Sequence, residues 1–142
     1  MKYHFRIHKE KDGYWAERAE GLNANTQADT LEEPYKNMKE VLELCLEEPK
    51  ESTYIPPLPD PSIKGGNIVE VAVDPKIALA AMVRRERLEQ KLSQRKAAEM
   101  LGFKNVIQYQ RLESGKNLNP ELETLIKLKR IFPRLSVDAA LA

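Results

Sequence analysis

Residues 2–8, KYHFRIH, alternate polar and apolar side chains. A period of two predicts a half-buried β-strand. The segment KDG then supplies a turn, and YWAERA predicts the returning strand of a hairpin. GLNANTQA predicts a third, short strand. Residues 67–73, NIVEVAV, are rich in β-branched side chains and predict a strand that returns to the same sheet.

Between the third and fourth strands, the spacing of apolar residues changes to that of a helix. One face of the segment DTLEEPYKNMKEVLELCLEE carries Tyr35, Met38, Leu42 and Cys45, three or four positions apart. Two starts are compatible with the sequence: a capping box from Thr30 to Glu33, or a helix that begins at Pro34. Residues 49–62, PKESTYIPPLPDPS, contain five prolines and predict an extended connector.

From Asp74 onward every periodic segment is helical. The first helix begins with Asp74 as N-cap and Pro75 at its first position, and runs to about Lys91. The later helices are expected from Ser93 to Gly102, from Asn105 to Ser114, from Asn119–Pro120 to Pro133, and from Ser136 onward. The pattern predicts an α+β domain over residues 1–73 and an all-α domain of about five helices over residues 74–142.

Composition places the chain among soluble proteins. Of its 142 residues, 42% are hydrophobic and 32% are charged, and no apolar run approaches the length of a membrane span. No hydrophobic signal segment follows Met1. The single cysteine excludes a disulfide framework and fits a reducing compartment. We therefore expect a cytoplasmic protein with no membrane partner.

Charge divides the chain at the same place as the helical pattern. Residues 1–74 hold 9 Lys and Arg against 15 Asp and Glu, a net charge of −6. Residues 75–142 hold 14 against 7, a net charge of +7. This asymmetry indicates two modules that meet different partners.

The segment SQRKAAEMLGFKNVIQYQRLESGK, residues 93–116, predicts two short helices around Gly102. Such a pair is typical of a helix-turn-helix, whose second helix enters the major groove of DNA. The pattern assigns Leu101, Tyr109 and Leu112 to the core. Gln108 and Arg111 remain on the outer side of the second helix, where their donors suit base edges and phosphates.

This segment resembles the lambda-repressor-like helix-turn-helix domains. The matching residues are Leu92-Ser93-Gln94, Ala97-Ala98, Leu101-Gly102, Tyr109, Leu112-Glu113, Ser114-Gly115-Lys116, Pro120, Leu122 and Leu125. The resemblance implies that Gln94 contacts the DNA backbone and that the start and middle of the second helix read bases. The DNA-binding residues expected are Gln94, Lys104, Asn105, Val106, Ile107, Gln108, Arg111 and Lys116.

Several roles within this set are open. The turn GFKN is one residue longer than the usual turn, so the sequence does not decide which of residues 105–108 face the groove. Val106 and Ile107 are either partly buried or in contact with thymine methyl groups. Glu113 is expected to serve a structural ion pair or cap, whereas Lys104 and Lys116 are expected to meet phosphates.

The order of elements in the first domain, together with the second domain, resembles the HicB antitoxin family. The marks of this resemblance are Asp12-Gly13-Tyr14, residues 29–33 (DTLEE), Asn37 and Pro61-Ser62. It implies a partial ribonuclease-H-like fold that covers the active site of a small basic ribonuclease toxin, HicA, while the helical domain binds the operator of the same operon. A homodimer is expected, with a higher oligomer when toxin is bound. The candidate toxin-binding residues are Tyr14, Trp15 and Glu17.

Two other functions are compatible with this domain organisation. One is a stand-alone repressor whose first domain senses a small molecule, although the first domain shows no cluster of polar residues typical of a pocket. The other is an enzyme fused to a DNA-binding domain. The strands offer only Glu17 and Glu70 as carboxylates for metal-dependent catalysis, and His4 and His8 are too far apart along one strand for easy joint zinc ligation. We therefore expect no catalysis, no cofactor and no metal, and a buried thiol at Cys45.

Overall fold

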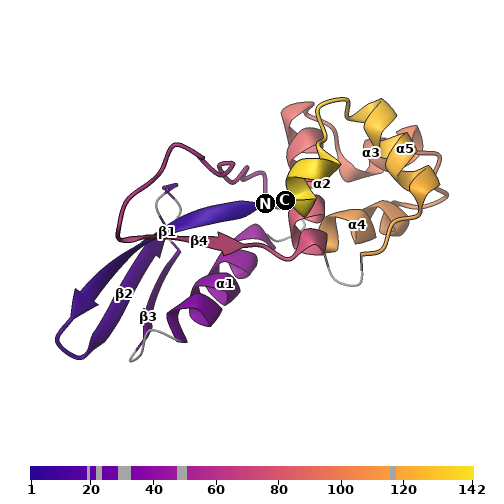
Figure 1. The fold of residues 1–142 in the computed structure, drawn as a ribbon. Helices are drawn as coiled ribbons and strands as arrows, with labels where there is room; N and C mark the ends of the chain where they lie inside the picture. The colour runs from indigo at the N-terminus through magenta and orange to yellow at the C-terminus, as the bar shows by residue number, and fades with distance from the viewer. Residues whose placement is uncertain (19, 22–23, 29–32, 48–50, 116–117) are drawn as a thin grey trace. The chain divides into compact units, whose positions relative to one another are not determined.

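The computed structural model describes residues 1–18, 20–21, 24–28, 33–47, 51–115 and 118–142 (Figure 1). The chain divides into two compact units. The front unit contains residues 1–46 and 56–74, and the rear unit contains residues 47–55 and 75–142.

The front unit contains a four-stranded antiparallel sheet. Its strands are β1 (Lys2–Glu10), β2 (Gly13–Arg18), β3 (Asn25–Ala28) and β4 (Ile68–Ala72). Their order is β3-β2-β1-β4, so the first strand of the chain lies inside the sheet between β2 and β4. Ile7 pairs with Ala16 across β1 and β2, and Tyr3 pairs with Val71 across β1 and β4. The structure thus confirms the four predicted strands.

Helix α1 (Glu33–Leu46) packs against β2, β3 and β4. Its buried row is formed by Met38, Leu42 and Leu46, one turn apart, and the sheet contributes Phe5 and other buried side chains to the same core. The predicted α+β arrangement is confirmed.

Two details of α1 can be compared with the sequence pattern. The helix begins at Glu33 with Pro34 in its first turn, where a missing N–H breaks no intrahelical bond. Thr30, the alternative cap, lies outside the described residues. The assignment of Tyr35 to the buried face is wrong, because its side chain is 45% exposed. Tyr35 precedes the row that starts at Met38, and its hydroxyl tolerates water.

Residues 56–67 are bonded to the sheet at both ends. The Tyr3 hydroxyl donates to the carbonyl oxygen of Pro57 at 3.0 Å, and the Ile7 amide donates to that of Asn67 at 2.8 Å. Between them, the Asp60 carboxylate accepts from the Ser62 amide at 2.9 Å and from its hydroxyl at 2.6 Å. These bonds fix a segment that has no ladder of its own.

Five helices form the described part of the rear unit after residue 74. They are α2 (Pro75–Glu89), α3 (Gln94–Met100), α4 (Val106–Ser114), α5 (Leu122–Ile131) and α6 (Val137–Leu141). The Ser93 hydroxyl accepts from the Lys96 amide at 3.0 Å, and the Ser136 hydroxyl accepts from the Ala139 amide at 3.1 Å. These caps confirm the predicted starts of α3 and α6.

The predicted start of the fourth helix in this unit is wrong. We expected Asn119 as the cap and Pro120 at the first helical position, but α5 begins at Leu122. Its N-cap is Glu121, whose extended backbone (ψ 154°) keeps Pro120 outside the helix, and no side-chain hydrogen bond caps the first turn. The structure confirms the predicted end, because α5 stops before Pro133.

Gly115 ends α4 in the left-handed conformation, with φ of 68°. A Cβ at this position would lie 3.2 Å from the Cα of Ile77, so both the backbone angle and the approach of α2 favour glycine. The buried side chains of the rear unit include Val83, Leu112, Leu128, Phe132 and Leu135. Among the described residues, no helix has both the length and the apolar character needed to cross a membrane.

Candidate nucleic-acid interface

Helices α3 and α4 pack against each other and are joined by a tight turn. Gly102 adopts φ of 74°, and the Phe103 amide donates to the carbonyl oxygen of Ala98 at 2.9 Å. Ala97 and Ala98 are buried, as close packing of two helices requires, and Leu101 and Tyr109 are buried as well. The predicted helix-turn-helix geometry is therefore present.

The start of α4 is held by a reciprocal cap. The side-chain oxygen of Asn105 accepts from the Gln108 amide at 3.1 Å, and the side-chain oxygen of Gln108 accepts from the Lys104 amide at 3.0 Å. This arrangement resembles a capping box displaced by one residue. The side-chain oxygens of Asn105 and Gln108 therefore bind backbone amides at the start of α4. The NH2 groups of the two side chains remain as donors for a ligand.

The outer face of α4 is centred on Ile107 and Arg111, one turn apart. Tyr109 and Leu112 are buried on the opposite side, and Val106 is half-buried beside them. Ile107 is 57% exposed. Gln108 and Arg111 are exposed as expected, and no described side chain bonds to the guanidinium of Arg111.

Gln94, expected at the DNA backbone, belongs to a network with α4. Its amide nitrogen donates to the Glu113 carboxylate at 3.0 Å, and its oxygen accepts from the Gln110 amide group at 3.1 Å. Gln94 is half-buried. These bonds fix its orientation and leave one N–H of its amide group available for a further acceptor.

A buried ion pair underlies this network. The Arg87 guanidinium donates to both Glu113 oxygens, at 2.6 and 3.0 Å, and its third nitrogen donates to the carbonyl oxygen of Leu92 at 2.9 Å. The two side chains are 5% and 4% exposed. The structural ion pair predicted for Glu113 is thus confirmed. Its partner Arg87 was missed, since a residue on another helix, 26 positions away, leaves no local signal.

The same cluster raises the pKa values of two ionisable groups, Arg87 and Tyr109. Burial alone would lower the pKa of Arg87, but the hydrogen bonds and negative charge of Glu113 raise it above its usual value. Burial, assisted by the Glu113 charge, raises the pKa of the Tyr109 phenol well above its ordinary range. The Tyr109 hydroxyl has no hydrogen-bond partner among the described residues. Both groups therefore keep their protons at neutral pH.

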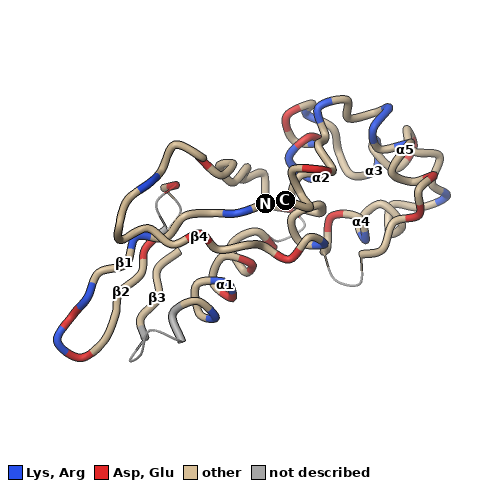
Figure 2. Tube along the Cα trace, viewed as in Figure 1, with Lys and Arg blue, Asp and Glu red and all other residues tan. Residues whose placement is uncertain are grey.

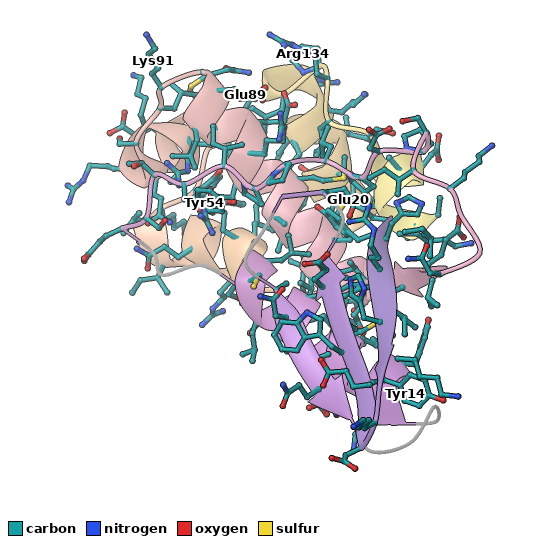
Figure 3. The ribbon with its side chains drawn as sticks, turned by 90° about the vertical axis from the view of Figure 1, so that its left-hand side faces the viewer. Tyr14, Glu20, Tyr54, Glu89, Lys91 and Arg134 are labelled. Carbon is teal, nitrogen blue, oxygen red and sulfur yellow. The ribbon has the colours of Figure 1, made fainter. Side chains whose placement is uncertain are left out.

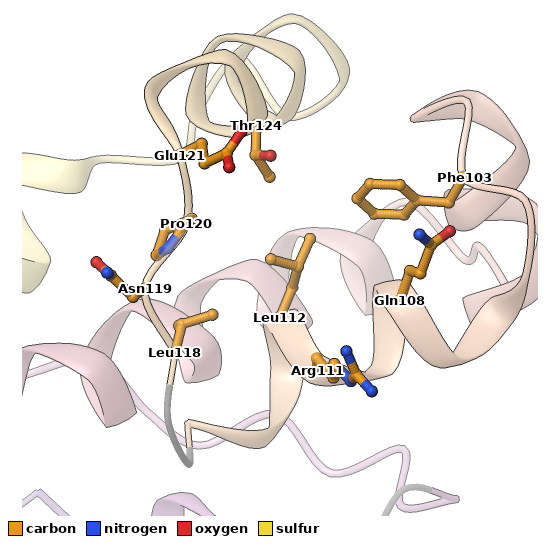
Figure 4. A pocket seen from close by; sticks show the side chains of 9 residues that line it. All are labelled: Phe103, Gln108, Arg111, Leu112, Leu118, Asn119, Pro120, Glu121 and Thr124. Carbon is orange, nitrogen blue, oxygen red and sulfur yellow. The ribbon is translucent and has the colours of Figure 1, made fainter.

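A pocket of about 580 Å³ opens beside the outer face of α4 (Figure 4). Gln108, Leu112 and Arg111 line it from α4, and residues 118–121 with Thr124 line it from the other side, with Phe103 at the turn. The late start of α5 leaves Asn119 and Pro120 in the loop that borders this hollow.

Two lysines complete the expected DNA-binding set. Lys104 is exposed at the start of α4, and Lys116 lies outside the described residues. The exposed Arg95, next to Gln94 on α3, was missed by the sequence analysis. The sequence could have indicated it, because Ser93 was predicted as the N-cap and Arg95 therefore falls in the first turn of α3, next to Gln94.

The three candidate toxin-binding residues of the front unit lie on β2, and the sheet separates them. Trp15 and Glu17 point to one face and Tyr14 to the other, since side chains alternate along a strand. Trp15 pairs with His8 across the strands. The Glu17 carboxylate lies 3.2 Å from His8 Nε2 and 3.5 Å from Arg6 Nη1.

His4 and His8 do not converge on a shared ligand. The His4 ring nitrogen Nδ1 lies 2.6 Å from the Glu20 carboxylate, and both side chains are almost fully buried. The Glu20 carboxylate also accepts from the His4 backbone amide at 3.0 Å. Figure 3 shows Glu20 at the opposite end of the sheet from Tyr14. Among the described residues, no group of three His, Cys, Asp or Glu side chains is placed to hold a metal ion.

Comparison with known protein families finds one match to the rear unit. The model of a helix-turn-helix family matches residues 83–138. These residues therefore form a helix-turn-helix domain, the kind of domain with which transcription regulators bind DNA. No curated protein matches the chain.

Proposed function

We propose that the chain is an antitoxin of the HicB type that also represses its own operon. In this proposal a homodimer binds operator DNA in the cytoplasm through the rear unit. The front unit, a partial ribonuclease-H-like fold, binds and occludes a small, basic, mRNA-cleaving toxin of the HicA type. The observation that carries the proposal is the exposed outer face of α4, with Gln108 and Arg111, within the matched helix-turn-helix domain.

The DNA-binding part is supported by the chemistry of α4 and its surroundings. Arginine forms paired hydrogen bonds to guanine, and an amide NH2 group donates to base or phosphate acceptors. Arg95 adds exposed positive charge at the start of α3, and Lys104 adds it in the turn before α4. A symmetric dimer would place two copies of α4 on two half-sites of a palindromic operator.

The toxin-binding part is supported by charge. The net charge of −6 over residues 1–74 attracts a cationic protein and repels nucleic acid. Figure 2 shows that the tip of the β1–β2 hairpin carries both signs. The surplus of acids therefore lies away from this tip, for example at Glu40 and Glu43 on α1.

A gel-shift experiment with the upstream DNA of the gene tests the repressor role. The variant Gln108→Ala with Arg111→Ala should lose operator binding and still neutralise toxin. Arg130→Ala removes an exposed arginine from α5 and serves as the matched control, with affinity close to the unaltered chain. Unaltered affinity of the double variant would reject α4 as the reading helix.

Co-expression with the product of the neighbouring reading frame tests the antitoxin role. A small basic partner should co-purify with the chain and change the fluorescence of Trp15, the only tryptophan. The absence of any such partner, together with a Trp15 signal that responds to a small molecule, would favour a ligand-sensing repressor instead.

A further inference from the structure

Ile107 is a large apolar side chain at the centre of a polar, exposed surface. It is 57% exposed, whereas Tyr109 and Leu112 on the other side of α4 are buried. Its neighbours on the outer face are the exposed Gln108 and Arg111.

Folding of the rear unit does not explain an isoleucine at this position. A side chain that stays in water contributes little to the core, and a β-branched residue is a mediocre helix former. Val106, which precedes it, is half-buried and supplies the apolar contact on the core side of α4. Burial of Ile107 against an apolar group of a ligand would remove its side chain from water.

The major groove of DNA presents one apolar group among its donors and acceptors, the C5-methyl group of thymine. We infer that Ile107 contacts the methyl group of a thymine in the operator. This inference rests on the proposed DNA binding by α4 and adds a specificity-determining residue to it.

The position of Arg111 on α4 limits the distance along the DNA between this thymine and the group that Arg111 binds. Four residues advance a helix by about 6 Å, and successive base pairs are separated by about 3.4 Å. The thymine therefore lies within about two base pairs of the base or phosphate bound by Arg111. Ile107 distinguishes thymine from cytosine and uracil, which lack the methyl group.

The test uses the full-length chain and a duplex that it selects from a random DNA library. Each thymine of the selected site is replaced in turn by deoxyuridine, which keeps the base pair and removes only the methyl group. One position should lose affinity roughly fourfold, the effect expected for one buried methyl group. For Ile107→Ala, the same replacement should have no effect.

Two controls separate this contact from other roles of the residue. Leu122→Ala removes an exposed apolar side chain from α5 and should leave the deoxyuridine effect unchanged. The mass of Ile107→Ala in sedimentation should equal that of the unaltered chain. A smaller mass would mean that Ile107 lies in an interface between two copies of the chain, and this result would overturn the inference.

The outcomes also separate the inference from the proposed function. Sequence-specific binding with no deoxyuridine effect, or with an effect that persists in Ile107→Ala, overturns the inference and leaves DNA binding intact. Failure to select any DNA sequence overturns both.

Discussion

The front and rear units each bury a carboxylate and bind it in different ways. In the rear unit, Glu113 is paired with Arg87 through two hydrogen bonds. In the front unit, Glu20 is paired with a ring nitrogen and the backbone amide of His4. A guanidinium is always charged in proteins, whereas the charge of an imidazole depends on pH.

The two pairs also connect different elements of the fold. The Arg87–Glu113 pair joins α2 to α4 and continues through Gln94 to α3, so it sets the arrangement of the helices that present the outer face. The His4–Glu20 pair joins β1 to the residue shortly after β2, within one hairpin. The first is part of the scaffold of the reading surface, and the second closes the end of a sheet.

Breaking the rear pair should have the largest effect on stability. Arg87→Met leaves the buried Glu113 carboxylate without its cation, and we expect the free energy of unfolding to fall by about 3–5 kcal/mol. Urea unfolding followed by helical circular dichroism measures it. Arg87→Met combined with Glu113→Leu should recover much of the loss. Equal stability of the single variant and the unaltered chain would contradict a structural role for this pair.

Breaking the front pair should cost less. Glu20→Gln keeps the shape of the side chain but removes its charge, and we expect a loss of about 1–3 kcal/mol. Trp15 fluorescence follows this transition, because Trp15 lies in the same sheet. Glu70→Gln is the control, since that carboxylate lies 3.8 Å from His4 and is 59% exposed. An equal loss in both variants would mean that burial of Glu20 is not the cause.

Variants of Asn105, the N-cap of α4, distinguish a role in helix capping from a role in base recognition. Asn105→Ala removes the oxygen that accepts from the Gln108 amide, and should destabilise the rear unit by about 1 kcal/mol in urea unfolding. Asn105→Ser keeps a capping oxygen and should restore most of this loss. If Asn105→Ser also keeps full operator affinity in a gel shift, Asn105 caps the helix and reads no base.

The smallest effect is expected at the surface turn of the front unit. The Ser62 hydroxyl and amide hold the pKa of Asp60 below its usual value. A lowered pKa stabilises the folded chain above the unfolded pKa of the group, and this contribution is lost as the pH falls through the folded pKa. Ser62→Ala should raise the pKa of Asp60 toward its ordinary value, as measured by NMR titration. An unchanged pKa would assign the shift to the backbone bond alone.

The features that could be predicted from the sequence are those with local causes. Alternation over KYHFRIH, glycine at 102 and 115, and serine at 93 and 136 each specify a strand, a turn or a helix end through nearby atoms. The late start of α5 was missed because the extended backbone of Glu121 competes with a favourable cap-and-proline pair.

The least predictable part of the site is how its side chains share hydrogen bonds. Gln108 was expected to read bases, but its oxygen binds the Lys104 amide. The position of Arg87 opposite Glu113 depends on how α2 and α4 pack, which no residue spacing encodes. The sequence left Ile107 either partly buried or in contact with thymine methyl groups, and its 57% exposure excludes the first alternative.

The pairing of β1 with β4 constrains how the front unit forms during synthesis. Lys2 pairs with Ala72, and β1 leaves the ribosome before β4, so β1 obtains this second neighbour only when the chain has emerged through residue 72. Until then, one edge of β1 is unpaired and open to association with other chains. A nascent chain interrupted before residue 72 therefore exposes an unpaired edge of β1. Completion of β4 covers this edge and protects the newly made protein from aggregation.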